Sequence, residues 1–266
     1  MPFNCIDQLG RQLSFKSHPK RIISLNPSQT ETLVDLDLEE NIVGVTKFCV
    51  HPKYLRKNKT IVGGTKKVSF KRIRQLQPDI ILCNKEENTK EMVDTLAKEF
   101  PVHVSNVETI ADALEMIIQY GALFNRETQA AAMCSSINIE LKKFKKKIEN
   151  INVKKVVYCI WKDPWMVVGS GTFIDHMLAI NNYENSYRVK ERYPLVSLED
   201  LKELSLDYIL LSSEPFPFTE KHKKELKNKL PNVKVKLVDG EYFSWYGSRL
   251  LSAFSYFETL NKQDNN

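Results

Sequence analysis

Two short stretches of this chain carry side chains that could bind a metal ion or act as nucleophiles. Cys49 and His51 follow one predicted buried strand, and Glu86 and Glu87 follow another. Thiolates, neutral imidazoles and carboxylates are common ligands of iron, zinc and cobalt. In an extended segment Cys49 and His51 would point to the same side, so these four residues are candidate metal ligands. The alternative is that Cys49 is a small buried apolar residue.

No pattern in the sequence carries an enzyme mechanism. Gly169–Gly171 lacks the spacing of a nucleophile elbow or a phosphate loop, and Val62–Thr65 lacks the glycines of a dinucleotide fingerprint. Neighbours on one strand, such as Cys49 and His51, rarely form the hydrogen bond that activates a nucleophile. We therefore expect a protein that is not an enzyme and requires no cofactor.

Aromatic side chains gather in the segments that follow the predicted strands. In open α/β sheets ligands bind beyond the carboxyl ends of the strands, so a ligand is expected there. A large flat ligand would stack on such rings, and a few polar side chains would fix its orientation. The candidate ligand-binding residues are Phe48, Asn84, Trp161, Trp165, Tyr193, Trp245 and Tyr246.

The elements that must position these residues include a repeat. Val68–Leu82 aligns without a gap with Val196–Leu210, at a constant offset of 128 residues. Each copy predicts a serine-capped amphipathic helix, an aspartate and a short buried strand. Around the first copy strands and helices alternate, which predicts a parallel sheet with helices on both faces. Ser28 and Glu31 predict a capping box for the first helix, and Phe3–Phe15 predicts a hairpin.

One long helix is predicted between the two halves of the chain. Arg126–Asn150 contains no Gly or Pro, and its apolar residues recur at three- and four-residue spacing. We therefore expect an α/β fold of two Rossmann-like lobes with parallel sheets, residues 1–124 and 151–266, joined by one backbone helix at 125–150. The ligand would lie in a cleft between these lobes.

Composition and charge exclude several classes of protein. A hydrophobic fraction of 42% argues against disorder, and the apolar runs are too short to cross a membrane. The net charge of +6 is carried by runs such as Lys142–Lys147, which we interpret as a solvated helix face without a nucleic-acid partner. The chain opens without a signal-peptide pattern, so a cytoplasmic protein is expected, or a periplasmic one if this is a trimmed mature form.

Three segments resemble a known family. Pro19–Glu31, Ile42–Thr46 and the helix and strand that end at Leu82 resemble the class III periplasmic binding proteins, which have a helical backbone. These are receptors of ABC importers for vitamin B12, haem and ferric siderophores, and the cobalamin-binding subfamily is the most similar. The resemblance covers essentially the whole chain. It implies a monomeric binding protein whose ligand is a corrinoid.

The resemblance also assigns residues. Phe48 and Tyr193 fall where the family has aromatic residues, and Trp165 falls near another, which implies stacking on a macrocycle. Gly63–Thr65 and Asn84 depart from the family pattern, since further aromatic residues are expected at these two places.

A third departure concerns the transport partner. In the family one Glu on each lobe docks onto arginines of the permease. Glu199 retains this residue in the second lobe, but Lys71 occupies the place in the first. A lysine facing an arginine would repel it, so an ABC permease is possible but disfavoured. Together with the missing export signal, this suggests a cytosolic relative that passes on its ligand without a permease.

Two alternatives remain open. The first is a haem or ferric-siderophore binding protein, with Cys49 or His51 as an iron ligand and with Lys85 and Arg249 facing an anionic ligand. The second is a cytosolic protein that handles a metal or cofactor, with Cys49, His51, Glu86 and Glu87 as its working cluster.

Overall fold

The protein, described here as a computed structural model of residues 2–262, consists of two compact units. The predicted outer limits of the two lobes, residues 1 and 266, lie outside the described residues. Each unit is assembled from separate stretches of the chain, so the units differ from the predicted lobes most clearly at residues 246–250. Among the described residues, unit 1 comprises 2–107, Ala111–Asn138 and Tyr246–Leu250, and unit 2 comprises Glu108–Ile110, Ile139–Trp245 and 251–262.

Unit 1 is built on a five-stranded parallel sheet in the order β5-β4-β3-β6-β7. Its strands are short aliphatic runs, and most of their residues are buried on both faces, as expected for a sheet covered on two sides. The prediction of a parallel sheet is therefore confirmed for this unit. The strands are β3 (Ile22–Ser24), β4 (Ile42–Thr46), β5 (Thr60–Gly63), β6 (Ile80–Asn84) and β7 (Val102–Ser105).

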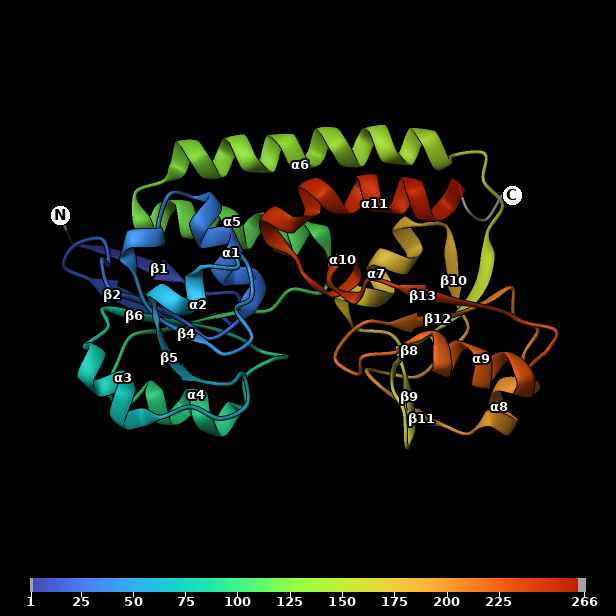
Figure 1. Ribbon diagram of the computed structural model, residues 1–266. Helices are drawn as coiled ribbons and strands as arrows, with labels where there is room; N and C mark the ends of the chain where they lie inside the picture. The colour runs from blue at the N-terminus through green and yellow to red at the C-terminus, as the bar shows by residue number, and fades with distance from the viewer. Residues whose placement is uncertain (1, 263–266) are drawn as a thin grey trace. The chain divides into compact units, whose positions relative to one another are not determined.

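Helices cover both faces of this sheet. Helices α1 and α5 lie on one side, and α3 and α4 lie on the other (Figure 1). Ile73 of α3 and Leu96 of α4 belong to one buried cluster with sheet residues such as Ile81. The helices are α1 (Pro27–Asp35), η1 (Glu39–Asn41), α2 (Leu55–Asn58), α3 (Phe70–Leu76), α4 (Lys90–Leu96) and α5 (Ile110–Phe124).

Helix α1 begins differently from the prediction. Asn26 is its N-cap, because the Asn26 side chain accepts a hydrogen bond of 3.2 Å from the Gln29 amide, and Pro27 is the first helical residue. Ser28 instead donates its hydroxyl to Asn26 Oδ1, and Glu31 pairs with an arginine. The predicted capping box is therefore wrong. Asparagine is as good a cap as serine, and proline is favoured at the first helical position.

The predicted N-terminal hairpin is confirmed, with β1 (Phe3–Ile6) antiparallel to β2 (Gln12–Phe15). The Asp7 carboxylate accepts hydrogen bonds from the Arg11 and Val104 amides, at 2.9 Å each. The second bond fixes the hairpin to β7, which is an edge strand of the sheet. Burial alone would raise the pKa of Asp7, but these amides and the Arg11 guanidinium outweigh it and lower that pKa.

The sheet of unit 2 has the order β11-β9-β8-β12-β13, and β10 also pairs with β8. Strands β8, β10, β12 and β13 are parallel, but β9 runs antiparallel to β8 and β11. The three residues between β8 and β9 are too few for a crossover, so the chain turns back directly. The strands are β8 (Lys154–Trp161), β9 (Trp165–Val167), β10 (Tyr183–Asn185), β11 (Leu195–Val196), β12 (Tyr208–Ser212) and β13 (Lys234–Val238).

Helices also cover both faces of the second sheet, with α8 and α9 on one side and α7, α10 and α11 on the other (Figure 1). The predicted long helix is confirmed as α6 (Glu127–Ile148), whose first half belongs to unit 1 and whose second half belongs to unit 2. In unit 2, Phe144 of α6 packs on Phe254 and Phe257 of α11. The remaining helices are α7 (Phe173–Ile180), α8 (Leu198–Lys202), α9 (Glu220–Lys229), α10 (Gly240–Ser244), η2 (Gly247–Arg249) and α11 (Leu250–Lys262).

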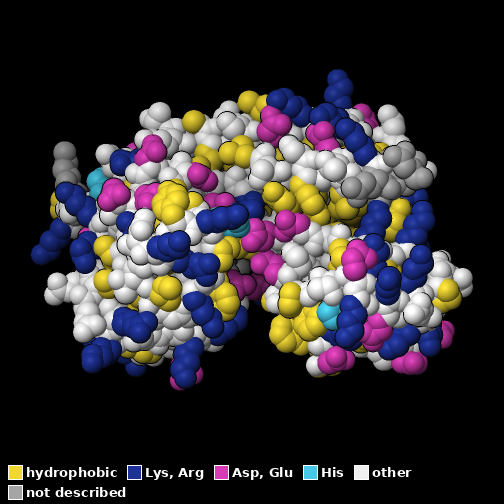
Figure 2. Space-filling model, in the orientation of Figure 1, with side chains coloured by type: hydrophobic (Ala, Val, Ile, Leu, Met, Phe, Trp, Pro, Cys, Tyr) yellow, Lys and Arg dark blue, Asp and Glu magenta, His cyan; other side chains and the backbone are white. Residues whose placement is uncertain are grey.

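The surface of the molecule is highly charged. All five lysines between residues 142 and 147 are exposed, and Lys143 and Lys147 form ion pairs with Glu140 and Glu258. Basic side chains are interspersed with acidic ones over the visible face (Figure 2). Within residues 2–262 no helix is both long enough and apolar enough to span a membrane.

Candidate ligand-binding site

In unit 1 the loop after β6 is shaped by Asn84. Its Oδ1 accepts hydrogen bonds from the Glu86 amide (2.9 Å) and the Glu87 amide (3.1 Å), and its Nδ2 donates to Ser105 Oγ (3.1 Å). Asn84 is 2% exposed. Its side chain therefore supports the loop that carries the two glutamates, at the carboxyl ends of β6 and β7.

Tyr246 reaches the same end of this sheet. Gln29 Nε2 donates to Ser105 Oγ (2.5 Å) and to the Tyr246 hydroxyl (3.2 Å). Tyr246 is almost fully buried, and burial raises its pKa, so the hydroxyl stays protonated. Asn84 and Tyr246 were candidates from the sequence, whereas Gln29 was not. The signal for Gln29 was its place in the first turn of a helix that directly follows a buried strand.

Phe48 is an exposed aromatic residue at this end of unit 1. It lies in the turn after β4 with 47% of its surface exposed, and the Lys47 ammonium lies 4.9 Å from its ring centroid. The ring lies beside Gly64, where an added Cβ would come within 3.3 Å of Phe48 Cε2. A glycine of the Gly63–Thr65 segment therefore leaves room for the Phe48 ring.

Cys49 is placed in the core. It is 0% exposed, and its sulfur lies 3.1 Å from Thr30 Oγ1 and 3.3 Å from Thr46 Oγ1. Burial raises the pKa of the Cys49 thiol, against the opposing effect of these hydroxyls, so the metal-binding thiolate is disfavoured. The Cys49 amide donates to the Thr46 carbonyl, which closes a turn. Cys49 is buried at the end of this turn, whereas His51 is partly exposed, so the two side chains differ in their access to a ligand.

The candidate metal ligands do not form one cluster. Burial raises the pKa of Glu87, although the nearby Lys66 charge opposes this shift. Glu86 is partly exposed beside it. Among residues 2–262 no three His, Cys, Asp or Glu side chains are arranged to hold a metal ion.

In unit 2 the structure separates two candidate tryptophans. Trp165 is 9% exposed and stacks on Phe218, with ring centroids 5.8 Å apart and planes 11° apart. Trp161, the last residue of β8, is 41% exposed and contacts Phe216 edge-on at 5.6 Å. Hydrophobic side chains gather beside a histidine on the surface of this unit (Figure 2). Trp161 therefore presents more ring surface to a ligand than Trp165 does.

The other two aromatic candidates of unit 2 have polar partners. Tyr193 is partly exposed, and the Arg192 guanidinium lies 5.7 Å from its ring centroid. Trp245 is 7% exposed and donates its indole N–H to Glu214 Oε1 (2.9 Å). Glu214 therefore fixes the orientation of Trp245. Glu214 stands where the repeat places Glu86 in unit 1, which was the only sequence signal for it.

The two docking positions implied by the resemblance are both on the surface. Lys71 is exposed in the first turn of α3. The Glu199 side chain is 79% exposed in the first turn of α8, with Lys202 at 3.8 Å. Equivalent helices of the two units therefore present opposite charges.

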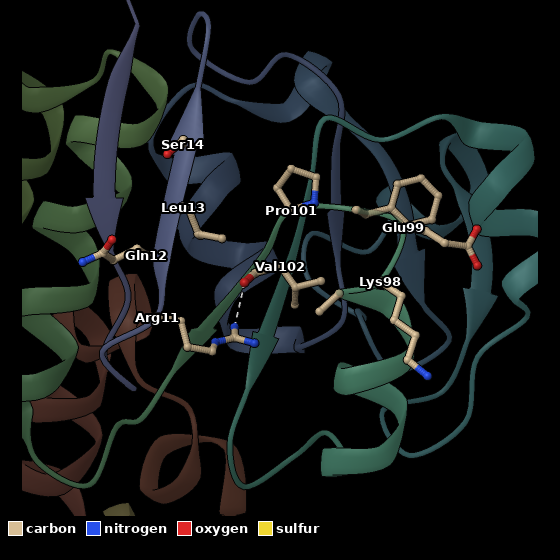
Figure 3. Close-up of a pocket in the computed structure, with 10 residues that line it drawn as sticks. Arg11, Gln12, Leu13, Ser14, Lys98, Glu99, Pro101 and Val102 are labelled. Carbon is tan, nitrogen blue, oxygen red and sulfur yellow. Dashed lines mark hydrogen bonds between the residues drawn. The ribbon is translucent and has the colours of Figure 1, made fainter.

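A hollow of about 460 Å³ lies elsewhere in unit 1, between β2 and the segment that enters β7. Figure 3 shows the Arg11 guanidinium donating to the Val102 carbonyl, at 2.6 Å. Val102 is the first residue of β7, so this hollow lies at the amino end of that strand. It is not at the end where Asn84 and Tyr246 meet.

A comparison with known families identifies this architecture. Residues 22–232 match the family model described as periplasmic binding protein. The chain belongs to the periplasmic binding protein family. The resemblance noted in the sequence and the expected α/β fold are therefore confirmed, and the family is one of binding proteins. A cytoplasmic location finds no support from this family, whose description is periplasmic.

Two curated relatives match most of the chain. An uncharacterised ABC transporter substrate-binding lipoprotein, YvrC of Bacillus subtilis, is 25% identical over 218 residues, which cover 79% of this chain and 68% of the relative. A vitamin B12-binding protein of Pectobacterium carotovorum is 23% identical over 239 residues, 88% of this chain and 86% of the relative.

Solved structures share the fold. The periplasmic vitamin B12-binding protein of Vibrio cholerae has a TM-score of 0.81 at 17% identity, covering 94% of this chain and 99% of that one. A periplasmic haem-binding protein of Roseiflexus has 0.79 at 18% identity (93% and 99%). An ABC-type Fe3+-hydroxamate transport protein of Saccharomonospora viridis has 0.76 at 20% identity (99% of both chains). At these identities the likeness concerns the fold alone.

Proposed function

We propose that this periplasmic binding protein is the substrate-binding component of an ABC importer and that its substrate is a corrinoid. The names of the Bacillus and Pectobacterium relatives support the two parts of this proposal. The observation that carries it is the placement of Phe48 and Trp161. The two side chains are 47% and 41% exposed, and each lies at the carboxyl end of a strand, the first in unit 1 and the second in unit 2.

Stacking explains why such residues suit a corrinoid. An exposed aromatic ring costs free energy in water, and a flat macrocycle gains contact area by covering it. Neither ring requires a proton transfer or a covalent bond to the ligand, so the proposed activity is binding without catalysis. Buried Trp165, Trp245 and Tyr246 would act by supporting the exposed residues around them.

Haem or a ferric siderophore is the second candidate. The solved haem-binding and Fe3+-hydroxamate proteins resemble this chain nearly as closely as the vitamin B12-binding protein does. Among the residues expected to meet such ligands, Arg249 is already paired with Glu31, whereas Lys85 is exposed. His51 is more accessible to iron than the buried Cys49.

The proposed partner is an ABC permease, and the proposed location is outside the cytoplasm. Exposed Glu199 could pair with a basic permease residue. Lys71 would repel such a residue, so docking through unit 1 would need an acidic or neutral partner surface.

The proposal is tested by titrating the purified protein with cobalamin, haem and a ferric hydroxamate, followed by visible absorbance. Phe48→Ala and Trp161→Ala should each weaken cobalamin binding about tenfold, since each removes a stacking ring. Tyr54→Ala is the matched control. Tyr54 is 48% exposed but bonds to Glu39, which precedes β4, so affinity should not change.

Three results would change the proposal. Binding of haem or the hydroxamate without cobalamin would replace the corrinoid by the second candidate. Cobalamin binding that both alanine variants leave intact would contradict the stacking site. Failure of all three ligands to bind would contradict the whole class of proposed substrates.

A further inference from the structure

Residues Tyr246–Leu250, the 246–250 segment, belong to unit 1 although the chain on either side of them belongs to unit 2. Trp245 directly before them is held in unit 2 by its bond to Glu214. The segment therefore needs contacts of its own to stay on unit 1, and all of the following contacts are made to α1.

Two of these contacts are made by the backbone and by Tyr246. The Ser248 amide donates to Thr32 Oγ1 (3.2 Å), and the Tyr246 hydroxyl accepts from Gln29 Nε2 (3.2 Å). Gly247 has a φ of +83°, and an added Cβ there would collide with Thr32 Oγ1. The segment thus lies directly on α1, without space for a side chain at position 247.

The third contact is a two-pronged ion pair. Arg249 Nε donates to Glu31 Oε2 (2.8 Å), and Arg249 Nη2 donates to Glu31 Oε1 (2.7 Å). The two side chains are only 9% and 18% exposed. Such bidentate pairs are geometrically specific, and removing one partner of a buried pair leaves an uncompensated charge. Glu31 and Arg249 therefore fix both the position and the orientation of the segment.

We propose that Glu31 and Arg249 are positioning residues for ligand binding, which act by holding the 246–250 segment on α1. The segment carries Tyr246, and through Gln29 the Tyr246 hydroxyl is tied to Ser105 at the carboxyl end of β7. Loss of the pair would release Tyr246 from the end of the sheet that carries Asn84. This inference rests on the proposed function, because it assumes that a ligand binds at this end.

The test uses Glu31→Gln and Arg249→Gln in the full chain, with two measurements. Hydrogen exchange of the ligand-free protein should show the Ser248 amide exchanging at least tenfold faster, while amides of β3 and β6 keep their protection. Cobalamin affinity should fall about tenfold. Arg249→Lys, which keeps the charge, should recover part of both losses.

Glu99→Gln is the matched control. Glu99 forms another bidentate pair in unit 1, with Arg74 at 2.7 and 2.6 Å, on an exposed surface. Glu99→Gln should change neither the exchange rate of the Ser248 amide nor the affinity for cobalamin. Gly247→Ala displaces the same segment without removing a charge, so it should reproduce the effects of Glu31→Gln even if one charge variant folds poorly.

The outcomes separate this inference from the proposed function. Unchanged Ser248 exchange in Glu31→Gln and Gly247→Ala would overturn the positioning role, and so would unchanged cobalamin affinity in variants with fast exchange. If the unmodified protein binds no cobalamin, haem or ferric hydroxamate, the proposed function fails and the positioning of a ligand site fails with it. If the Ser248 amide still exchanged faster in the Glu31 and Arg249 variants, the pair would have a structural role only.

Discussion

The two copies of the repeat are Val68–Leu82 in unit 1 and Val196–Leu210 in unit 2. In both copies an aspartate accepts backbone amides from the neighbouring strand. Asp79 Oδ2 accepts the Lys20 and Arg21 amides at 2.8 and 2.9 Å, and Asp207 Oδ2 accepts the Lys155 amide at 2.8 Å. In both units this aspartate directly precedes a strand and fixes the start of that strand to the start of its parallel neighbour. The fold therefore requires the same residue at both positions.

The segments that follow the repeat strands are also alike. Asn84 ends β6 and accepts the amide two residues later, and Ser212 ends β12 and accepts the Glu214 amide at 3.3 Å. Asparagine and serine can both close a turn of this kind with their side chains. The two units use different residues for the same turn, and both turns carry a glutamate.

The outward faces of the two helices are where the copies differ. Helix α3 presents Lys71, Arg72 and Arg74, whereas α8 presents Glu199 and Asp200. No buried contact of the fold depends on Lys71 or Glu199, so their charges are free to follow a partner. The comparison teaches that the two copies share the contacts on which the fold depends, whereas the charges of Lys71 and Glu199 differ without affecting those contacts.

The largest effect is expected where the turn residues are removed. Asn84→Ala and Ser212→Ala should each destabilise their own unit by about 3 kcal/mol, because each side chain is buried and makes at least three hydrogen bonds. Hydrogen exchange of β6 and β12 amides measures the two units separately. Asn84→Ser, which gives unit 1 the residue of unit 2, should recover about half of the loss. If only one of the two alanine substitutions destabilised its unit, the two turns would not be equivalent.

A smaller effect is expected at the aspartates. Asp79→Ala should cost about 2 kcal/mol and Asp207→Ala about 1 kcal/mol, since Asp79 accepts two backbone amides from its neighbour and Asp207 accepts one. Exchange of the amides at the start of β3 and β8 reports the result. Asn at either position keeps an acceptor and serves as the control. Equal costs would show that the second amide bond of Asp79 contributes little.

The smallest effect is expected at the helix caps. Ser197 takes part in a capping box with Asp200, whereas Ser69 only accepts the Arg72 amide at 3.4 Å. Ser197→Ala should therefore cost about 1 kcal/mol and Ser69→Ala about half of that. Urea unfolding, monitored by hydrogen exchange of the amides in α3 and α8, measures both stability costs.

Lowering the pH gives a second test of the difference between the two helix caps. Hydrogen bonds from the Ser197 amide and hydroxyl lower the pKa of Asp200 below its ordinary value of 3.8. The contribution of Asp200 is therefore present above that value and is lost as the pH falls through the lowered pKa. The difference between the Ser197 and Ser69 variants should shrink at that point. A difference that does not change with pH would contradict the capping box.

The sequence was sufficient for the parts of the fold that local patterns determine. Helix α6, the hairpin and the repeat follow from apolar spacing and from cap and turn residues within a few positions of each other. The reversal of β9 was missed because three connecting residues decide it and the apolar pattern of a strand carries no direction. The pairing of Glu31 with Arg249 was missed because the two residues are 218 positions apart.

Sequence reasoning predicted the types of residue at the candidate site better than their exposure. Trp161 ends one strand and Trp165 begins the next, and nothing in their neighbours indicates that only Trp165 packs under α8 and α9. That outcome depends on which face of the sheet each ring occupies. Cys49 likewise looked reactive in sequence, and two threonines from separate elements surround it in the fold.

The placement of Tyr246–Leu250 in unit 1 also affects biosynthesis. A chain made from its N-terminus can form the first sheet and α1 long before residue 246 leaves the ribosome. Until then the sides of Gln29 and Thr32 that face this segment lack their partners, which lie more than two hundred positions later. Domains generally fold in the order of synthesis, yet here unit 1 is completed only after Ile139–Trp245 of unit 2 have been made.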